Sequence, residues 1–195
     1  MILDCLRHGI TTNNLAGQFN ADDDVILTEE VARLSMVRLS VDYDLIHVSP
    51  LPRAIQTANA LGLQGYKLDA RLRERSFGRF QGLTPDDCAA RFPEAYSAFQ
   101  TFDPNFAPPG GESRRAHLDR VRHWLTDLPV STQGRALAIT HGGVIDFLYR
   151  LGASLDLHGG PIHAGTNLGV SCFEVNGADI RLLSFSQPLG SVVGS

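Results

Sequence analysis

The sequence predicts an α/β fold: a three-layer α/β/α sandwich with a mostly parallel central sheet and a small helical cap. Short apolar stretches alternate with longer amphipathic ones along most of the chain, which is typical of strands joined by helices. The short stretches are apolar at successive positions, as expected for strands that helices cover on both faces. A length of 195 residues suits one domain with its own core, so we expect residues 1–195 to form a single domain.

Short apolar runs bounded by polar or turn-forming residues are the predicted strands. They lie at residues 2–6, 45–48, 66–68, 136–140, 168–175 and 180–185. Asn176-Gly177 joins the last two, and this dipeptide favours a tight turn between antiparallel strands. We therefore expect a parallel sheet that ends in one C-terminal hairpin.

Amphipathic stretches with start signals are the predicted helices. They lie at residues 28–40, 51–61, 112–128 and 141–151, with a further helix that begins at Thr84-Pro85. Thr28 is the expected N-cap of the first, and Glu29 and Glu30 carry charges that suit a helix N-terminus. Pro93 interrupts the helix that begins at Thr84, and a loop rich in Pro and Gly follows. Residues 77–109 are the expected cap.

The composition limits the partners and the compartment. A net charge of -4 argues against nucleic acid as the main partner, although a few arginines in one pocket can still bind a small anion. We see neither an apolar run long enough to cross a membrane nor a signal peptide. Cys5, Cys88 and Cys172 do not suit a disulfide framework or a zinc site. Cys5 and Cys172 lie in apolar, strand-like runs, and we expect both to be small buried residues. We therefore expect a cytoplasmic protein.

Charged side chains follow several predicted strands at the point where each strand ends. Arg7 and His8 follow the first strand, and Arg53 comes shortly after the second. His141 follows the fourth strand, before a pair of glycines that opens a helix. The carboxyl ends of parallel strands meet at one edge of a sheet, so these side chains should converge. Because arginine and helix N-termini both bind phosphate, the sequence predicts a phosphate site at this edge.

Five blocks of sequence carry these residues in order along nearly the whole chain. They are Leu6-Arg7-His8-Gly9 with Thr11 and Asn14, Ser49-Pro50-Leu51 with Arg53-Ala54 and Gln56-Thr57-Ala58, Leu72-Arg73-Glu74 with Phe77-Gly78-Arg79-Phe80-Gln81-Gly82, Pro109-Gly110-Gly111-Glu112-Ser113, and Thr140-His141-Gly142-Gly143. Together they resemble the motifs of the histidine phosphatase superfamily, which is also called phosphoglycerate-mutase-like. One short block would be weak evidence, whereas five in the family's order are strong evidence.

The resemblance implies a role for each matching residue. His8 would attack phosphorus and carry the phosphoryl group. Glu74 would protonate the leaving oxygen and then help to deprotonate the attacking water. Arg7, Arg53 and His141 would hold the phosphate oxygens and stabilise their charge in the transition state. Further substrate-binding residues would be Asn14, Asn20 and Gly142.

The chemistry sets a requirement on His8. Its attacking nitrogen must be unprotonated, so the other ring nitrogen should donate to an acceptor such as a backbone carbonyl. Neighbouring cations disfavour protonation of His8, whereas a bound phosphate favours it. We expect no metal and no cofactor, because the arginines and His141 would stabilise the charge on the phosphate.

Plainer interpretations exist for several of these residues. Arg53 could pair with a surface carboxylate, Glu74 could belong to an exposed ion-pair network, and Glu112 could either orient the site or cap a helix. The aromatic residues of the cap could pack together or line a substrate pocket: Phe92, Tyr96, Phe99, Phe102 and Phe106. The remaining histidines are expected to be structural: His47, His117, His123, His158 and His163.

The resemblance implies hydrolysis of a small phosphomonoester through a phosphohistidine intermediate. A phosphoglycerate mutase would use the same core, but such mutases carry a longer insertion between the acid and the second histidine. A phosphate-binding scaffold without activity is the alternative from another class, and the presence of every core residue argues against it. Ile10, Ala21 and Val31 depart from residues common in the family and leave the substrate open. We expect no membrane partner, and a homodimer is the possible assembly.

Overall fold

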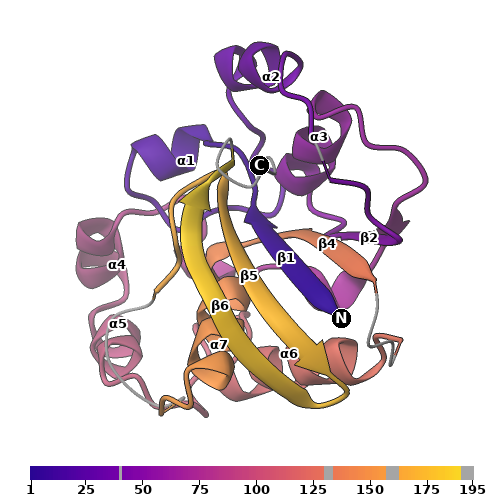
Figure 1. The fold of residues 1–195 in the computed structure, drawn as a ribbon. Coiled ribbons are helices and arrows are strands. Elements are labelled where there is room, and N and C mark those ends of the chain that lie inside the picture. The colour runs from indigo at the N-terminus through magenta and orange to yellow at the C-terminus, as the bar shows by residue number, and fades with distance from the viewer. Residues whose placement is uncertain (40, 130–133, 157–162, 190–195) are drawn as a thin grey trace.

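A computed structural model describes residues 1–39, 41–129, 134–156 and 163–189. These residues form a six-stranded sheet in the order β3-β2-β4-β1-β5-β6 (Figure 1). The pairs β3·β2, β2·β4 and β4·β1 are parallel, whereas β1·β5 and β5·β6 are antiparallel. The predicted sheet, mostly parallel with a C-terminal hairpin, is therefore confirmed.

The strands agree closely with the predicted ones. Their bounds are β1 (Ile2–Arg7), β2 (Leu45–Val48), β3 (Lys67–Leu68), β4 (Arg135–Thr140), β5 (Gly169–Asn176) and β6 (Asp179–Pro188). Asn176 pairs with Asp179, so the hairpin loop consists of Gly177 and Ala178. Gly177 has a φ of 59°, a conformation that glycine adopts without strain.

Seven α-helices and two 3-10 helices are present in the described part of the chain. They are α1 (Thr12–Leu15), α2 (Thr28–Leu34), α3 (Pro52–Ala60), α4 (Pro85–Arg91), α5 (Pro93–Gln100), α6 (Arg114–Thr126), α7 (Gly142–Gly152), η1 (Ala70–Leu72) and η2 (Gly78–Phe80). The sequence analysis did not predict α1, which is a single turn held by a capping box at Thr11.

Two hydrophobic clusters, one on each face of the sheet, confirm the three layers. Along β4, Ala136 and Ala138 belong to the cluster that contains Trp124 of α6 and Leu148 of α7. Leu137 and the other alternate residues of β4 belong to the cluster formed with α2 and α3. Side chains of successive strand residues point to opposite faces, so a strand that is apolar throughout requires helices on both sides.

The predicted boundaries of two helices are wrong. Thr28 is the first residue of α2 rather than its N-cap, and that helix ends at Leu34 instead of residue 40. The hydroxyl of Ser35 donates to the backbone oxygen of Ala32 at 2.8 Å, a local bond that competes with helical hydrogen bonding. The end predicted at residue 40 itself lies outside the described residues. Residues 112–128 contain α6, but the N-cap is Ser113, whose side chain accepts from the Ala116 N–H.

The cap predicted at residues 77–109 is helical. It contains η2, α4 and α5, and Figure 1 shows α4 and α5 together at one side of the molecule. Phe80 is fully buried and contacts the rings of Phe92, Tyr96 and Phe99. The packing interpretation of these cap aromatics therefore agrees with the structure. In the described ranges, no helix combines the length and the apolar character that crossing a bilayer requires.

We expect the cluster formed by α6, α7 and the sheet to dominate stability. Leu148 is fully buried there, so Leu148→Ala should lower the free energy of unfolding by about 2–5 kcal/mol in urea titrations. Leu183, with 42% of its surface exposed on β6, is the matched control. Leu183→Ala should cost less than about 1 kcal/mol. Equal losses in the two variants would contradict this assignment of the core.

Candidate active site

Parallel pairing of β1 with β4 brings the two predicted histidines together. Arg7 lies opposite Thr140 in the register, so His8 and His141 leave adjacent strands at the same edge. The backbone N–H of His8 donates to the Thr140 oxygen at 3.0 Å, and the two imidazole centroids are 5.1 Å apart. The convergence predicted from the strand ends is therefore present in the structure.

The surroundings of His8 fix its tautomer and its charge. Its Nδ1 lies 2.8 Å from the Gly9 carbonyl oxygen, which can only accept, so Nδ1 carries the proton. Burial lowers the pKa of His8 well below its ordinary value, and the charges of Arg53 and Arg7 lower it further, against the Gly9 hydrogen bond. His8 is thus neutral at neutral pH, with its nucleophilic lone pair on Nε2.

His141 is held by a residue to which the sequence analysis assigned no role. Its Nε2 lies 2.7 Å from the Ser49 hydroxyl, which also accepts from the Leu51 N–H at 3.3 Å in the turn after β2. Burial, followed by the charge of Arg53, lowers the pKa of His141 well below its ordinary value. The neutral ring can therefore serve a phosphate as a hydrogen-bond donor.

Two arginines approach the histidines from different elements. Arg53 of α3 is 1% exposed and donates to the Ala21 oxygen at 2.8 Å, so the surface ion-pair interpretation is wrong. Arg7 donates to the Gly165 oxygen at 2.7 Å. Burial lowers the pKa of both guanidinium groups, and the charge of Glu74 opposes this effect. Positive charge held in a buried position attracts an anion more strongly than it would in water.

The Glu74 carboxylate is anchored by two backbone N–H groups. It accepts from Arg75 at 2.8 Å and from Gly143 at 3.0 Å. A Cβ atom at Gly143 would lie 2.2 Å from a Glu74 oxygen, so this position requires glycine. Arg71 pairs with Asp69 nearby, but Glu74 forms no ion pair with the described residues, which disfavours the exposed-network interpretation.

Glu112 supports Glu74 indirectly and does not cap a helix. Its carboxylate accepts from Arg120 at 2.8 Å. Arg120 in turn donates to the backbone oxygens of Arg71 and Arg73 at 2.7 Å and of Glu74 at 3.1 Å. This clamp holds the backbone that leads to Glu74 and the backbone of Glu74 itself. Of the two alternatives left open for Glu112, the contacts favour orientation of the site.

The two predicted asparagines belong to one hydrogen-bonded network. Asn14 donates to the Asn20 side-chain oxygen at 3.0 Å, and Asn20 donates to Thr11 at 3.0 Å. Asn167 completes the network, because its amide donates to the His8 carbonyl oxygen at 3.0 Å and to Asn14 at 3.1 Å. Sequence reasoning missed Asn167, which lies in the loop before β5 outside every recognised motif.

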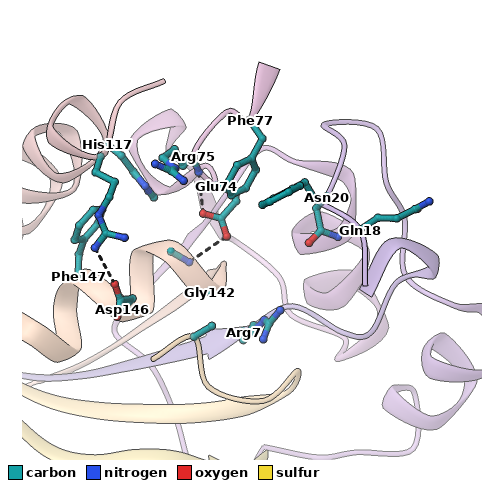
Figure 2. A pocket seen from close by; sticks show the side chains of 14 residues that line it. Arg7, Gln18, Asn20, Glu74, Arg75, Phe77, His117, Gly142, Asp146 and Phe147 are labelled. Atoms are coloured by element: carbon teal, nitrogen blue, oxygen red, sulfur yellow. Dashed lines mark hydrogen bonds and ion pairs between the residues drawn. The ribbon is translucent and has the colours of Figure 1, made fainter. Parts of the chain in front are cut away.

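A cavity of about 200 Å³ lies beside the predicted site (Figure 2), but His8, Asn14, Arg53 and His141 are not among the residues that line it. Its lining includes Arg7, Asn20, Glu74 and Gly142, which were predicted, together with His117, for which only a structural role was expected. Further lining residues were not predicted to bind substrate: Gln18, Phe19, Arg75, Phe77, Arg114, Gly143, Asp146, Phe147 and Ala164. Figure 2 shows Glu74 on one side of the cavity and Arg7 on the other.

The cysteines and the potential metal ligands lie as follows in the structure. Cys5 is a buried free thiol, as predicted, whereas Cys172, which was expected to be buried, is partly exposed, and Cys88 is also a buried free thiol. The described ranges contain no group of three or more His, Cys, Asp or Glu side chains placed to hold a metal ion. His158 lies outside the described residues.

Comparison with known proteins decides the family. The family model described as the histidine phosphatase superfamily (branch 1) matches residues 3–188. The chain belongs to the histidine phosphatase superfamily.

Several superfamily members are similar to this chain. "Phosphoglycerate mutase-like protein 4" of Arabidopsis thaliana is 36% identical, over 74% of this chain and 67% of that protein. "Glucosyl-3-phosphoglycerate phosphatase" of Mycolicibacterium vanbaalenii is 34% identical, over 82% and 77%. "Metal-independent phosphoserine phosphatase" of Arabidopsis thaliana is 33% identical, over 74% and 65%. A putative alpha-ribazole-5'-P phosphatase from Escherichia coli shares the fold, with a TM-score of 0.78 at 23% identity over 96% of each chain.

Buried neutral histidines should make stability depend on pH. Burial lowers the pKa of His8, His117 and His141 well below the value of about 6.5 expected in the unfolded chain. Below pH 6.5 the unfolded chain binds protons that the folded chain does not. The free energy of unfolding should therefore decrease as the pH is lowered. Each histidine should contribute up to about 1.4 kcal/mol per pH unit.

Urea unfolding between pH 7.5 and 5.5 measures this slope. His117→Gln should reduce the slope by the amount that corresponds to about one proton fewer taken up on unfolding. The same substitution at His123, an exposed residue of α6, is the matched control and should leave the slope unchanged. An unchanged slope in His117→Gln would contradict the neutral, buried state of that ring.

Proposed function

We propose that the protein hydrolyses small phosphomonoesters through a phosphohistidine at His8. One observation carries the proposal: Nδ1 of the buried His8 donates to the Gly9 carbonyl, which leaves Nε2 as an unprotonated nucleophile that the charges of Arg7 and Arg53 keep neutral. A histidine held in this way can form a covalent intermediate at neutral pH. Membership of the superfamily supports the same chemistry.

The first half-reaction transfers the phosphoryl group to the protein. Nε2 of His8 forms a bond to phosphorus while the bond between phosphorus and the ester oxygen breaks. Arg7, Arg53 and His141 stabilise negative charge on the transferring oxygens. In its protonated form, Glu74 gives a proton to the departing oxygen, so the first product leaves as an alcohol.

The second half-reaction restores the protein. Water attacks phosphorus, and the bond between phosphorus and Nε2 of His8 breaks. Glu74 takes one proton from the water, so inorganic phosphate leaves and the carboxylic acid is regenerated. The anchoring of Glu74 by the Arg75 and Gly143 N–H groups keeps the same carboxyl group in place for both steps.

Metal independence and a cytoplasmic location belong to the same proposal. The similarity to a protein named metal-independent phosphoserine phosphatase supports the first, together with the charge that Arg7 and Arg53 supply. The free thiols of Cys5, Cys88 and Cys172 suit a reducing compartment.

That the protein forms a homodimer is still a prediction. Light scattering on the purified protein would test it.

We expect wild-type protein to hydrolyse an aryl phosphate in the presence of a chelator. His8→Ala should lower turnover by at least about 10³-fold, because the variant lacks the nitrogen on which the covalent intermediate forms. Release of nitrophenol and of inorganic phosphate measures both activities. Wild-type turnover retained in His8→Ala would contradict the mechanism, and loss of wild-type turnover with the chelator would contradict metal independence.

Phosphate binding without any wild-type turnover would favour the inactive scaffold, and transfer to an added phosphoglycerate would favour the mutase.

Loss of the proton donor should depend on the leaving group. Glu74→Gln should lower kcat/KM for an alkyl phosphate by about 10²–10⁴-fold, because an alkoxide leaves poorly without a proton. Nitrophenyl phosphate should be affected much less, since nitrophenolate leaves unprotonated. Equal losses for the two esters would argue against a proton donor at Glu74. Glu94→Gln, which removes one negative charge from an exposed position of α5 in the cap outside the cavity, is the control for general electrostatic effects.

A further inference from the structure

Three buried nitrogen atoms near His8 have no hydrogen-bond partner among the described residues. They are Nε of Arg7, Nε of Arg53 and Nδ1 of His141. The two arginine nitrogens carry hydrogen and can only donate, and a buried donor without an acceptor costs free energy that an anion would offset. Nδ1 of His141 belongs to this set of donors only in the tautomer that has its proton there. The contacts of the other ring nitrogen determine which tautomer is present.

That other nitrogen contacts a fully buried serine. The Ser49 hydroxyl oxygen lies 2.7 Å from Nε2 of His141. The same oxygen accepts from the Leu51 N–H at 3.3 Å, and a backbone N–H can only donate. The described residues offer the hydroxyl hydrogen no acceptor besides the ring nitrogen. The hydroxyl therefore donates to Nε2, which has to be unprotonated to accept it.

The charge of the ring then places its proton on Nδ1. Burial, followed by the charge of Arg53, lowers the pKa of His141, so the ring is neutral and carries one proton. Because Nε2 accepts from Ser49, that proton resides on Nδ1, which is the third donor of the set. His8 has its proton on the same atom but in the opposite arrangement, since its Nδ1 is bonded to Gly9 and its Nε2 is free.

The sheet holds Ser49 beside this ring. Ser49 follows β2 directly, and its N–H donates to the Ile139 oxygen of β4 at 3.0 Å. His141 follows the same strand, two positions after Ile139. The parallel pairing of β2 with β4 thus fixes the serine relative to the histidine, while the Leu51 N–H orients its oxygen. A group that is held in advance needs little reorganisation when a ligand arrives.

We propose that Ser49 is a positioning residue that fixes the tautomer of His141, so that Nδ1–H of His141 donates to the phosphate of the substrate. This rests on the proposed function, in which His141 contacts the transferred phosphate. Without the hydroxyl, the proton can move to Nε2. The lone pair on Nδ1 would then face the anion, which repels it and forms no hydrogen bond with it.

Nitrogen NMR tests the tautomer without turnover. In protein with ¹⁵N-labelled histidine at neutral pH, the spectrum shows which nitrogen of each ring carries the proton, and His141→Gln assigns the His141 signals by their loss. Wild-type protein should have the proton on Nδ1. Ser49→Ala should shift a large part of the population to the tautomer with the proton on Nε2. A wild-type proton on Nε2, or an unchanged Nδ1–H tautomer in Ser49→Ala, would overturn the proposal.

Calorimetry with inorganic phosphate tests the consequence for binding. Ser49→Ala should raise Kd about 10-fold, because a hydrogen bond to a charged ligand is lost. Ser49→Thr keeps the hydroxyl and should bind phosphate more tightly than Ser49→Cys, which keeps the size of the side chain but donates only weakly. The reverse order is expected of a packing role and would overturn the proposal.

The matched control is a second buried serine outside the site. Ser171 on β5 is 1% exposed, and its hydroxyl oxygen accepts from the Ser186 N–H at 3.1 Å. Ser171→Ala should leave both the His141 spectrum and the phosphate Kd unchanged. An effect equal to that of Ser49→Ala would show a general consequence of losing a buried hydroxyl and would overturn the proposal.

These measurements are independent of catalysis. Failure of the wild-type protein to hydrolyse an aryl phosphate would refute the proposed function and would leave the tautomer measurable. Normal hydrolysis with an unchanged His141 tautomer in Ser49→Ala would refute only the role of Ser49.

Discussion

Parallel pairing of β1 with β4 is the constraint on which the candidate active site depends. The pairing sets His8 and His141 side by side where the two strands end, with their ring centroids 5.1 Å apart. The same register lets the His8 N–H bond to Thr140, while the Thr140 hydroxyl donates to the Leu72 oxygen at 2.8 Å. Through that contact the central strands also fix the segment that leads to Glu74.

Burial gives this arrangement its electrostatic character. It disfavours the charged form of each imidazole, and the adjacent guanidinium groups have the same effect on the rings. The result is a pocket whose positive charge resides on arginines and whose histidines are neutral. An anion that enters would stabilise the arginines and raise the proton affinity of the rings. Such a site is arranged for a negatively charged ligand and carries a cost without one.

A second set of contacts places the acid. The Glu74 carboxylate is fixed at both oxygens by backbone N–H groups, and Arg120 holds the backbone carbonyl of the same residue. Glu112 in turn holds Arg120 by two hydrogen bonds. The Pro-Gly-Gly-Glu-Ser block is far from Glu74 in sequence, yet its glutamate determines how firmly the acid is positioned. Groups arranged in advance need little reorganisation during the reaction.

Much of the fold was predictable because strand ends and apolar runs are local signals. The positions of β1, β2 and β4 followed from short apolar runs, and their parallel order placed His8, Arg53 and His141 together. Residues that act through side-chain contacts across the chain had no such signal. Ser49 meets His141 across 92 positions and Asn167 meets His8 across 159, so only the folded arrangement reveals them. At the early end of α2 the Ser35 hydroxyl bonds to the Ala32 oxygen, a local contact that amphipathic periodicity does not detect.

Trapping the phosphorylated protein tests the central claim most directly. Rapid acid-free quenching during turnover of a labelled phosphomonoester, followed by mass spectrometry and phosphorus NMR, locates the phosphoryl group on the chain. The account predicts phosphate on Nε2 of His8, because Nδ1 is bonded to the Gly9 carbonyl. Phosphate on Nδ1, on His141 or on a carboxylate would contradict it, as would turnover with no phosphorylated protein.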